Sequence, residues 1–452
     1  MAKQKTDLVY GPIIKSIFSF CIPLVLGSLL QVFFNMADQI VLGQMAGSVA
    51  LASVGACGNV VGILVNFFIG LSGGVGVVLA RAIGRGDDAA SKRIIGTAFC
   101  ASVIIGLSAL CIALPAAAPL LKLTQCPEEC FKGALTYTYI YSLGIPVITV
   151  YNFCATAIRV TGDSRRPTLY MVAGGALNVA LNVTLCFIMQ NKVAAVAIAT
   201  VVSQGLSAFL TVRRLVIIKE SYRLELRHPI LDRSVFFKFL RYGIPSGFVS
   251  CLFNIANLQL QAGINSFGTD AIAGHSAACS VESLISPFVA GFAVTASTMV
   301  GQNLGAEKPD RVKKAIVYNE AFSVGVACVL CLIVWFIRIP LLKLYVPEAP
   351  DAIIFAETRM KCVLLWFGVN AASAVVSHTL NAYGYSIFVM ISNILSTIVF
   401  RTFWMQLVFP RVGTFMVIMQ CYTVSWWITL TCNAVFLCWV YSRYKKGRVR
   451  NL

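Results

Sequence analysis

The chain has 452 residues, of which 58% are hydrophobic and only 12% are charged. Apolar stretches recur from one end to the other, far beyond what one soluble core needs, so the composition excludes an ordinary soluble domain. The formal net charge of +18 would suit a nucleic-acid partner if the basic residues formed one patch, but they are spread over alternate connections.

Twelve windows are long and apolar enough to cross a bilayer, and each must be helical because hydrocarbon satisfies no backbone hydrogen bonds. Several windows exceed the usual length, so tilted or kinked helices are expected. The predicted fold class is therefore all-α, a polytopic membrane protein. In chain order, the windows cover residues 13–42, 49–80, 94–122, 134–158, 168–190, 193–212, 236–266, 271–302, 315–342, 354–380, 386–409 and 412–442.

The basic residues concentrate at the N-terminus, in the even-numbered connections and at the C-terminus. By the positive-inside rule, this asymmetry predicts that both termini and the long 213–235 connection lie in the cytoplasm. The net charge is thus an orientation signal, and no nucleic-acid partner is predicted. The N-terminal MAKQKTDLVYGPIIK and the apolar run after it are interpreted as an uncleaved first helix, not as a signal peptide.

The chain repeats itself at an offset of about 220 residues, a sign of two homologous halves. Ile22-Pro23 recurs as Ile244-Pro245, and LLKL at 120–123 recurs at 341–344. Each half has an even number of spans, so both halves face the same way, as in transporters that alternate access between two bundles. We predict an N-terminal six-helix lobe at 1–218, a cytoplasmic linker at 219–235 and a C-terminal six-helix lobe at 236–452.

Four polar side chains in the N-terminal half are expected at a similar depth. Asp38 lies toward the outer end of the first span, Asn178 and Asn182 lie one turn apart on the fifth, and Thr200 follows the start of the sixth. An acid inside a membrane span is a functional candidate by default. The alternative is that Asp38 reaches water at the interface and that the amides hold helices together.

The C-terminal half offers a second set of candidates. Glu282 lies near the middle of the eighth span, where it either contacts a cationic substrate or pairs with a neighbouring donor. His275 is interpreted as a satisfied polar residue, and Arg401 inside the eleventh span requires a partner that the sequence does not identify. Further candidate cleft residues on the seventh span are Asn254, Asn257 and Gln259.

Motifs spread over the whole chain resemble the multidrug and toxic compound extrusion (MATE) family. They are DQIVLGQMAGSVALASVG after the first span, ARAIGRGDDAASKR after the second, IRVTGDSRRP after the fourth and VGQNLGA after the eighth. The resemblance, to the bacterial branch, implies an acid on the first helix that couples transport to a cation, which Asp38 matches, and a hinge at Pro23. It also implies coupling roles for Asn178, Asn182 and Thr200.

One residue departs from the family pattern. The position of Asn182 is usually an aspartate in the family, so this pocket carries one negative charge fewer. We therefore expect H+ as the coupling ion, with Na+ as the alternative.

The resemblance implies a secondary active antiporter that exports small, often cationic or amphipathic compounds across the bacterial inner membrane. We expect a monomer among membrane lipids, with no enzymatic activity, cofactor or metal, since neither a Walker motif nor HExxH occurs. A lipid-linked flippase of the same superfamily is the alternative, disfavoured by a shortage of Lys and Arg inside the spans. A channel is disfavoured by the two-half repeat.

The segment QCPEEC, after the third span, contains Cys126 and Cys130. The two thiols could form a disulfide or bind a metal, but the ligand set is incomplete for zinc. Proline followed by two acids also suits the start of a helix, which is the interpretation we favour.

Overall fold

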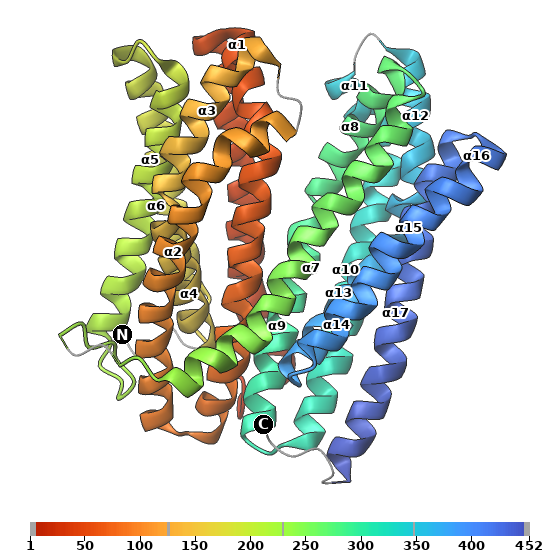
Figure 1. Ribbon diagram of the computed structural model, residues 1–452. Coiled ribbons are helices and arrows are strands. Elements are labelled where there is room, and N and C mark those ends of the chain that lie inside the picture. Colours follow the sequence, from red (N-terminus) through yellow and green to blue (C-terminus); the bar gives the residue numbers. More distant parts are fainter. Residues whose placement is uncertain (1–5, 124–126, 228–229, 347–348, 447–452) are drawn as a thin grey trace. The chain divides into compact units, whose positions relative to one another are not determined.

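The structure, a computed structural model, describes residues 6–123, 127–227, 230–346 and 349–446. Side chains are not described at residues 39, 40, 42–52, 56, 58–60, 253–255 and 258. Every regular element within the described ranges is a helix (Figure 1). The predicted all-α fold class is therefore confirmed.

The first helix, α1 (Ile13–Arg85), has 73 residues and contains two candidate spans, Ile13–Asp38 and Val61–Arg85. A straight helix of this length would measure about 110 Å, far more than one bilayer, so we treat the spans as separate crossings. The sequence predicts a break at 43–48, whereas the helical backbone continues through it. Residues 43–48 contain no proline, and Gly43 and Gly47 weaken a helix without blocking it as proline does.

Five helices complete the first half: α2 (Asp88–Leu123), α3 (Glu128–Leu143), α4 (Ile145–Val160), α5 (Arg165–Ile188) and α6 (Lys192–Ile217). Helices α3 and α4 form one span that bends by 48° at Gly144. Pro146 follows the break, and its missing N–H favours an interruption at this point. Asn191 caps α6 by accepting a hydrogen bond from the Ala194 N–H at 3.1 Å, which fixes where this helix begins.

The second half begins with α7 (Arg233–Asn265), and α8 (Thr269–Ser283) and α9 (Ser286–Gly305) form a span bent by 44°. The remaining α-helices are α10 (Pro309–Phe336), α11 (Arg338–Tyr345), α12 (Pro350–Cys362), α13 (Phe367–Ala382), α14 (Ser386–Asn393), α15 (Phe400–Phe403), α16 (Phe409–Val412) and α17 (Phe415–Lys445). A 3-10 turn, η1 (Leu364–Trp366), and two π-helical segments, η2 (Ile394–Val399) and η3 (Trp404–Val408), interrupt the later spans.

The described part of the chain contains nine helices that are long and apolar enough to cross a membrane, and eleven spans if each bent pair counts as one. The predicted window 236–266 corresponds to α7, which this count leaves out. Each of the twelve predicted windows lies largely on helix.

The chain divides by packing into two compact units, which we describe separately. The first consists mainly of Leu26–Gly247, and the second of Asp7–Val25 with Phe248–Leu452. Along α1 and α7 the division falls just after Pro23 and Pro245, which lie inside these helices. The predicted lobes, 1–218 and 236–452, follow the sequence repeat and stay a prediction.

Glycines allow very close helix packing in the first unit. A Cβ on Gly74 of α1 would lie 2.3 Å from the Phe239 carbonyl oxygen of α7. A Cβ on Gly174 of α5 would lie 2.9 Å from the Ser203 carbonyl oxygen of α6. Because only glycine fits at Gly174, α5 and α6 approach closely and hold their polar faces in register.

The second unit has its own apolar core, formed by α7 to α17. Residues at its centre include Leu260, Met360, Phe415 and Trp426. The N-terminal segment also belongs to this unit, since the Asn303 amide donates a hydrogen bond to the Leu8 carbonyl oxygen at 3.0 Å. This core surrounds the buried charged residues described below.

Candidate functional site

The four polar residues predicted in the N-terminal half meet in the first unit. Asp38 comes from α1, Asn178 and Asn182 from α5, and Thr200 from α6. Asn182 is fully buried and Asn178 nearly so, whereas Asp38 and Thr200 are half-buried. We call these four residues the N-site.

Hydrogen bonds connect the members of the N-site. The Asn182 amide nitrogen donates to Asp38 Oδ1 at 2.6 Å and lies 3.3 Å from Asn178 Oδ1. The Asn178 amide nitrogen lies 3.4 Å from Thr200 Oγ1. The structure thus brings together the group that the sequence places at one depth.

The amide of Asn178 has two possible orientations, which correspond to different charge states of Asp38. If the amide is turned over, its nitrogen lies 2.8 Å from both Asp38 carboxylate oxygens, and its oxygen accepts from the Thr200 N–H at 3.3 Å. That orientation suits an ionised Asp38, which only accepts hydrogen bonds. The other presents the Asn178 oxygen to Asp38 and suits the protonated acid, which can donate.

One acceptor in the N-site is open. The Oδ1 atom of the buried Asn182 has no hydrogen-bond donor within the described part of the chain. A buried polar atom without a partner is uncommon and calls for an explanation, such as an ion or water. Tyr137 of α3 is buried beside the group. The N-site can therefore hold a proton on Asp38 or surround a small cation with oxygen atoms.

Glu282 of α8 is engaged by an arginine that the sequence interpretation overlooked. Arg359 of α12 donates from Nε to Glu282 Oε1 at 3.1 Å and from Nη2 to Oε2 at 2.7 Å. Arg359 is 5% exposed and Glu282 6%. Of the two alternatives for Glu282, the structure shows the pairing with a neighbouring donor. The signal available in the sequence was a basic residue near the start of the 354–380 window.

His275 belongs to the same cluster. Its Nδ1 atom lies 3.3 Å from Arg359 Nη1, and its Nε2 atom lies 3.5 Å from Cys279 Sγ. Because arginine only donates, Nδ1 must accept, and the imidazole is neutral with its proton on Nε2. His275 is thus a satisfied polar residue, as the sequence predicts.

Arg401 of α15 is fully buried in the second unit. Its Nη1 lies 3.3 Å from Asn257 Oδ1 of α7, and its Nε and Nη2 lie 3.2 and 3.0 Å from Ser425 Oγ of α17. Its guanidinium also lies 4.7 Å from the ring centre of Tyr422. These contacts supply partners that the sequence did not identify.

Two predicted cleft residues remain, Gln259 and Asn254. Gln259 Oε1 accepts a hydrogen bond from Thr402 Oγ1 at 3.1 Å, whereas the side chain of Asn254 lies outside the described residues. Cys126 also lies outside them, so its pairing with Cys130 stays open. In the described ranges no group of three His, Cys, Asp or Glu side chains could hold a metal ion.

Two buried arginines, Arg359 and Arg401, lie inside the second unit. A flippase is disfavoured by a shortage of Lys and Arg inside the spans, among which the sequence identifies Arg401. The structure adds Arg359, whose partner Glu282 is 77 residues away, so that no local pattern reveals the pair.

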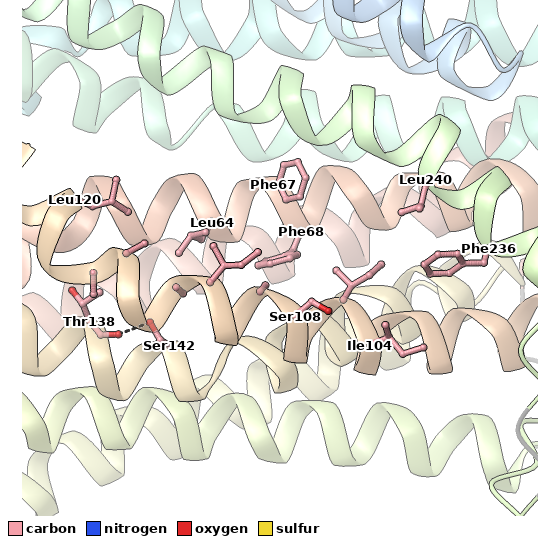
Figure 2. Close-up of a pocket in the computed structure, with 16 residues that line it drawn as sticks. Leu64, Phe67, Phe68, Ile104, Ser108, Leu120, Thr138, Ser142, Phe236 and Leu240 are labelled. Atoms are coloured by element: carbon pink, nitrogen blue, oxygen red, sulfur yellow. Dashed lines mark hydrogen bonds between the residues drawn. The ribbon is translucent and has the colours of Figure 1, made fainter.

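The first unit also contains an apolar cavity of about 460 Å³ between α1, α2, α3 and α7. Figure 2 shows Phe67, Phe68 and Leu240 among its lining residues, with Thr138 and Ser142 at one end. The two hydroxyls donate to backbone carbonyl oxygens of their own helix. The cavity therefore offers an apolar surface, as ligand pockets commonly do.

Comparisons with known proteins agree with this architecture. The model of the MatE family matches residues 23–184 and 245–404, one segment in each half. The chain is 27% identical to the probable multidrug resistance protein YpnP of Bacillus subtilis over 403 residues, 87% of the chain and 88% of that protein. It is 24% identical to a protein named FAD transporter from Shewanella oneidensis, over 84% of the chain and 85% of that protein.

A solved structure shares the fold. It is described as the outward-facing conformation of a multidrug resistance MATE family transporter. The match has a TM-score of 0.88 and 20% sequence identity, and it covers 99% of the chain and all of that structure. Together with the family model, which matches both halves, this agreement identifies the chain as a multi-pass membrane protein of the MatE family, the family that its motifs resemble.

Proposed function

We propose that the protein is a cation-coupled antiporter that exports small cationic or amphipathic compounds by alternating access. The observation that carries this proposal is the N-site, in which two amides contact a single intramembrane carboxylate and a hydroxyl contacts one of these amides. An acid in such surroundings changes its interactions when it gains or loses a cation. Ion occupancy can then favour one conformation over another, which is what coupling requires.

A proton is the coupling ion that the N-site favours. Asp38 is the one acid in the group, and Asn178 can turn its oxygen toward a protonated Asp38 or its nitrogen toward an ionised one. The site thus accommodates both protonation states without moving a helix. Sodium would use the oxygen atoms of Asp38, Asn178, Asn182 and Thr200, but with one negative charge instead of the two in the family pattern.

Pro23 serves as the hinge in this proposal. It interrupts the hydrogen bonding of α1 about four turns before Asp38, and the division between the packing units follows it closely. A change at Asp38 can therefore be accompanied by bending of a helix that contributes to both units. We further propose that the transporter is a monomer in the inner membrane, surrounded by lipid, with both termini in the cytoplasm.

Drug-like substrates are supported by the names of similar proteins. YpnP and the multidrug export protein MepA of Staphylococcus aureus are both described as multidrug proteins. The apolar cavity of Figure 2 supplies a surface that suits the hydrophobic part of an amphipathic compound. Neither feature depends on one particular substrate.

An anionic aromatic substrate is a second candidate. Both oxygens of Glu282 are engaged by Arg359, so this acid does not receive a cationic drug in the conformation described here. The similar protein from Shewanella oneidensis is named for FAD, which carries phosphate groups. Buried guanidiniums favour such groups.

A substrate panel separates the two candidates. The chain would be expressed in a host that lacks its own efflux pumps, and resistance and efflux would be measured for cationic dyes and for FAD. Preferential efflux of the dyes, lost in Asp38→Asn, supports the first candidate, and preferential efflux of FAD supports the second. Equal accumulation of every compound in cells with and without the protein would contradict both. Surface quantification would verify that each variant reaches the membrane.

A further inference from the structure

The N-site has a counterpart in the second unit, built from the corresponding helices. In the first half, Asn182 on the fifth span contacts Asp38 on the first at a separation of 144 residues. In the second half, Arg401 on the eleventh span contacts Asn257 on the seventh, also 144 residues apart. The family model matches both halves, at residues 23–184 and 245–404.

The sixth span of each half completes the correspondence. Asn178 contacts Thr200 on α6, 22 residues further on, and Arg401 contacts Ser425 on α17, 24 residues further on. A neighbouring contact repeats the pattern, since Thr402 bonds to Gln259 at a separation of 143 residues. We call Asn257, Arg401 and Ser425 the C-site.

The two sites differ in what supplies the charge. The N-site contains a carboxylate, which attracts a mobile cation, whereas the C-site contains a guanidinium, which is a cation attached to the chain. In the C-site this cation already donates to an amide oxygen and to a hydroxyl oxygen. The N-site also contains amide and hydroxyl oxygen atoms, on Asn178, Asn182 and Thr200.

The π-helical segments explain how Arg401 reaches the position. Arg401 belongs to the short helix α15, which lies between η2 and η3. The wider turns of a π-helix rotate the residues that follow relative to a regular α-helix, and such segments are frequent at functional sites. A hydrogen bond between Ser396 and Thr429 also connects η2 to α17.

We propose that Arg401 is a built-in cation that occupies the C-site permanently, so that the protein binds one coupling ion per transport cycle, at Asp38. The inference rests on the proposed coupling role of Asp38 and adds the stoichiometry to it. Arginine stays charged at every physiological pH. A second mobile cation in the C-site would meet this charge at contact distance, and the buried surroundings would screen the repulsion poorly.

The ratio of ions to substrate tests the proposal. Purified protein in proteoliposomes would receive a known ion gradient, with the membrane potential clamped at zero so that the charge of the substrate from the panel does not affect the ratio. At the point of zero net flux, a tenfold ion gradient sustains about a tenfold substrate gradient for one ion and about a hundredfold gradient for two. We expect the one-ion value for the parent protein. The two-ion value in the parent would overturn the proposal.

A double variant tests whether Arg401 is what excludes a second ion. Asn257→Asp with Arg401→Asn recreates the acid and amide of the N-site, and we expect the two-ion value. An unchanged one-ion value in a transporting double variant would contradict the role of Arg401. Arg401→Lys keeps a cation and should keep the one-ion value, as should the control Arg338→Asn, which removes an arginine paired with Glu357 elsewhere in the unit.

The same assay separates failure of this inference from failure of the proposed function. Asp38→Asn should sustain no substrate gradient in response to the ion gradient. If Asp38→Asn retained full coupling, the proposed function would be wrong. The parent protein could instead sustain the substrate gradient expected for two ions, and Asp38→Asn the gradient expected for one. In that case the coupling role of Asp38 would stand, and the proposal that Arg401 is a built-in cation would be refuted.

Discussion

Removing either charge of the Glu282–Arg359 pair should strongly destabilise the second unit. Glu282→Gln leaves the Arg359 guanidinium buried without its carboxylate, and Arg359→Met leaves the carboxylate without its cation. The pair has two charge-assisted hydrogen bonds, at 3.1 and 2.7 Å. At roughly 1.5–3 kcal/mol for each such bond, their loss costs about 3–6 kcal/mol. Removing one member of a buried ion pair typically costs about 3–5 kcal/mol.

The double variant is expected to recover much of this loss. Glu282→Gln with Arg359→Met leaves no buried charge at the pair, so it should be far less destabilised than the sum of the two single variants. Thermal unfolding in detergent would measure these differences. The Tm of a domain of 150–250 residues changes by about 2–4 °C for each kcal/mol of stability. A cost of about 3–5 kcal/mol should therefore lower the Tm of each single variant by roughly 6–20 °C. Single variants within about 2 °C of the parent, or a double variant as unstable as the sum, would refute this account of the pair.

Three further predictions concern helix packing, the hinge and the orientation. Gly174→Ala should destabilise the first unit by about 1–3 kcal/mol, because its Cβ would lie 2.9 Å from a backbone oxygen. The control is Gly205→Ala on α6, where a Cβ would have no atom within 4 Å. Equal Tm values for the two variants would contradict the predicted clash at Gly174. Pro23→Ala should slow transport while expression and Tm stay near the parent values, and unchanged efflux would reduce Pro23 to a structural residue. A cysteine introduced at Ser221 should be protected from a membrane-impermeant maleimide in intact cells and one at Glu129 should react, whereas the opposite pattern would reverse the orientation.

Local patterns predicted the helices and the N-site well. The twelve apolar windows all lie largely on helix, because apolar length is a property of each segment alone. Asp38, Asn178, Asn182 and Thr200 could be grouped because counting the rise per residue puts them at one depth. The continuous helix through 43–48 was missed, since Gly43, Gly47 and Ser48 resemble a turn.

Contacts between distant segments could not be predicted in the same way. Arg359 and Glu282 lie on α12 and α8, and nothing in either segment indicates its partner. Arg401 required a partner, but its contacts depend on the π-helical turns at η2 and η3, which shift the register away from that of a regular helix. Packing also assigns Asp7–Val25 to the second unit, although the repeat alone associates this segment with the first half.

The most direct test of the central claim is efflux from proteoliposomes driven first by a pH gradient without sodium and then by a sodium gradient at equal pH. If Asp38 couples transport to protons, the parent should respond to the pH gradient alone, and Asp38→Asn should respond to neither while remaining folded by its Tm. Asn182→Asp, which restores the second acid of the family pattern, should shift the response toward sodium. Efflux by Asp38→Asn equal to that of the parent would contradict the coupling role of Asp38, and a parent that responds to sodium alone would contradict the assignment of the proton.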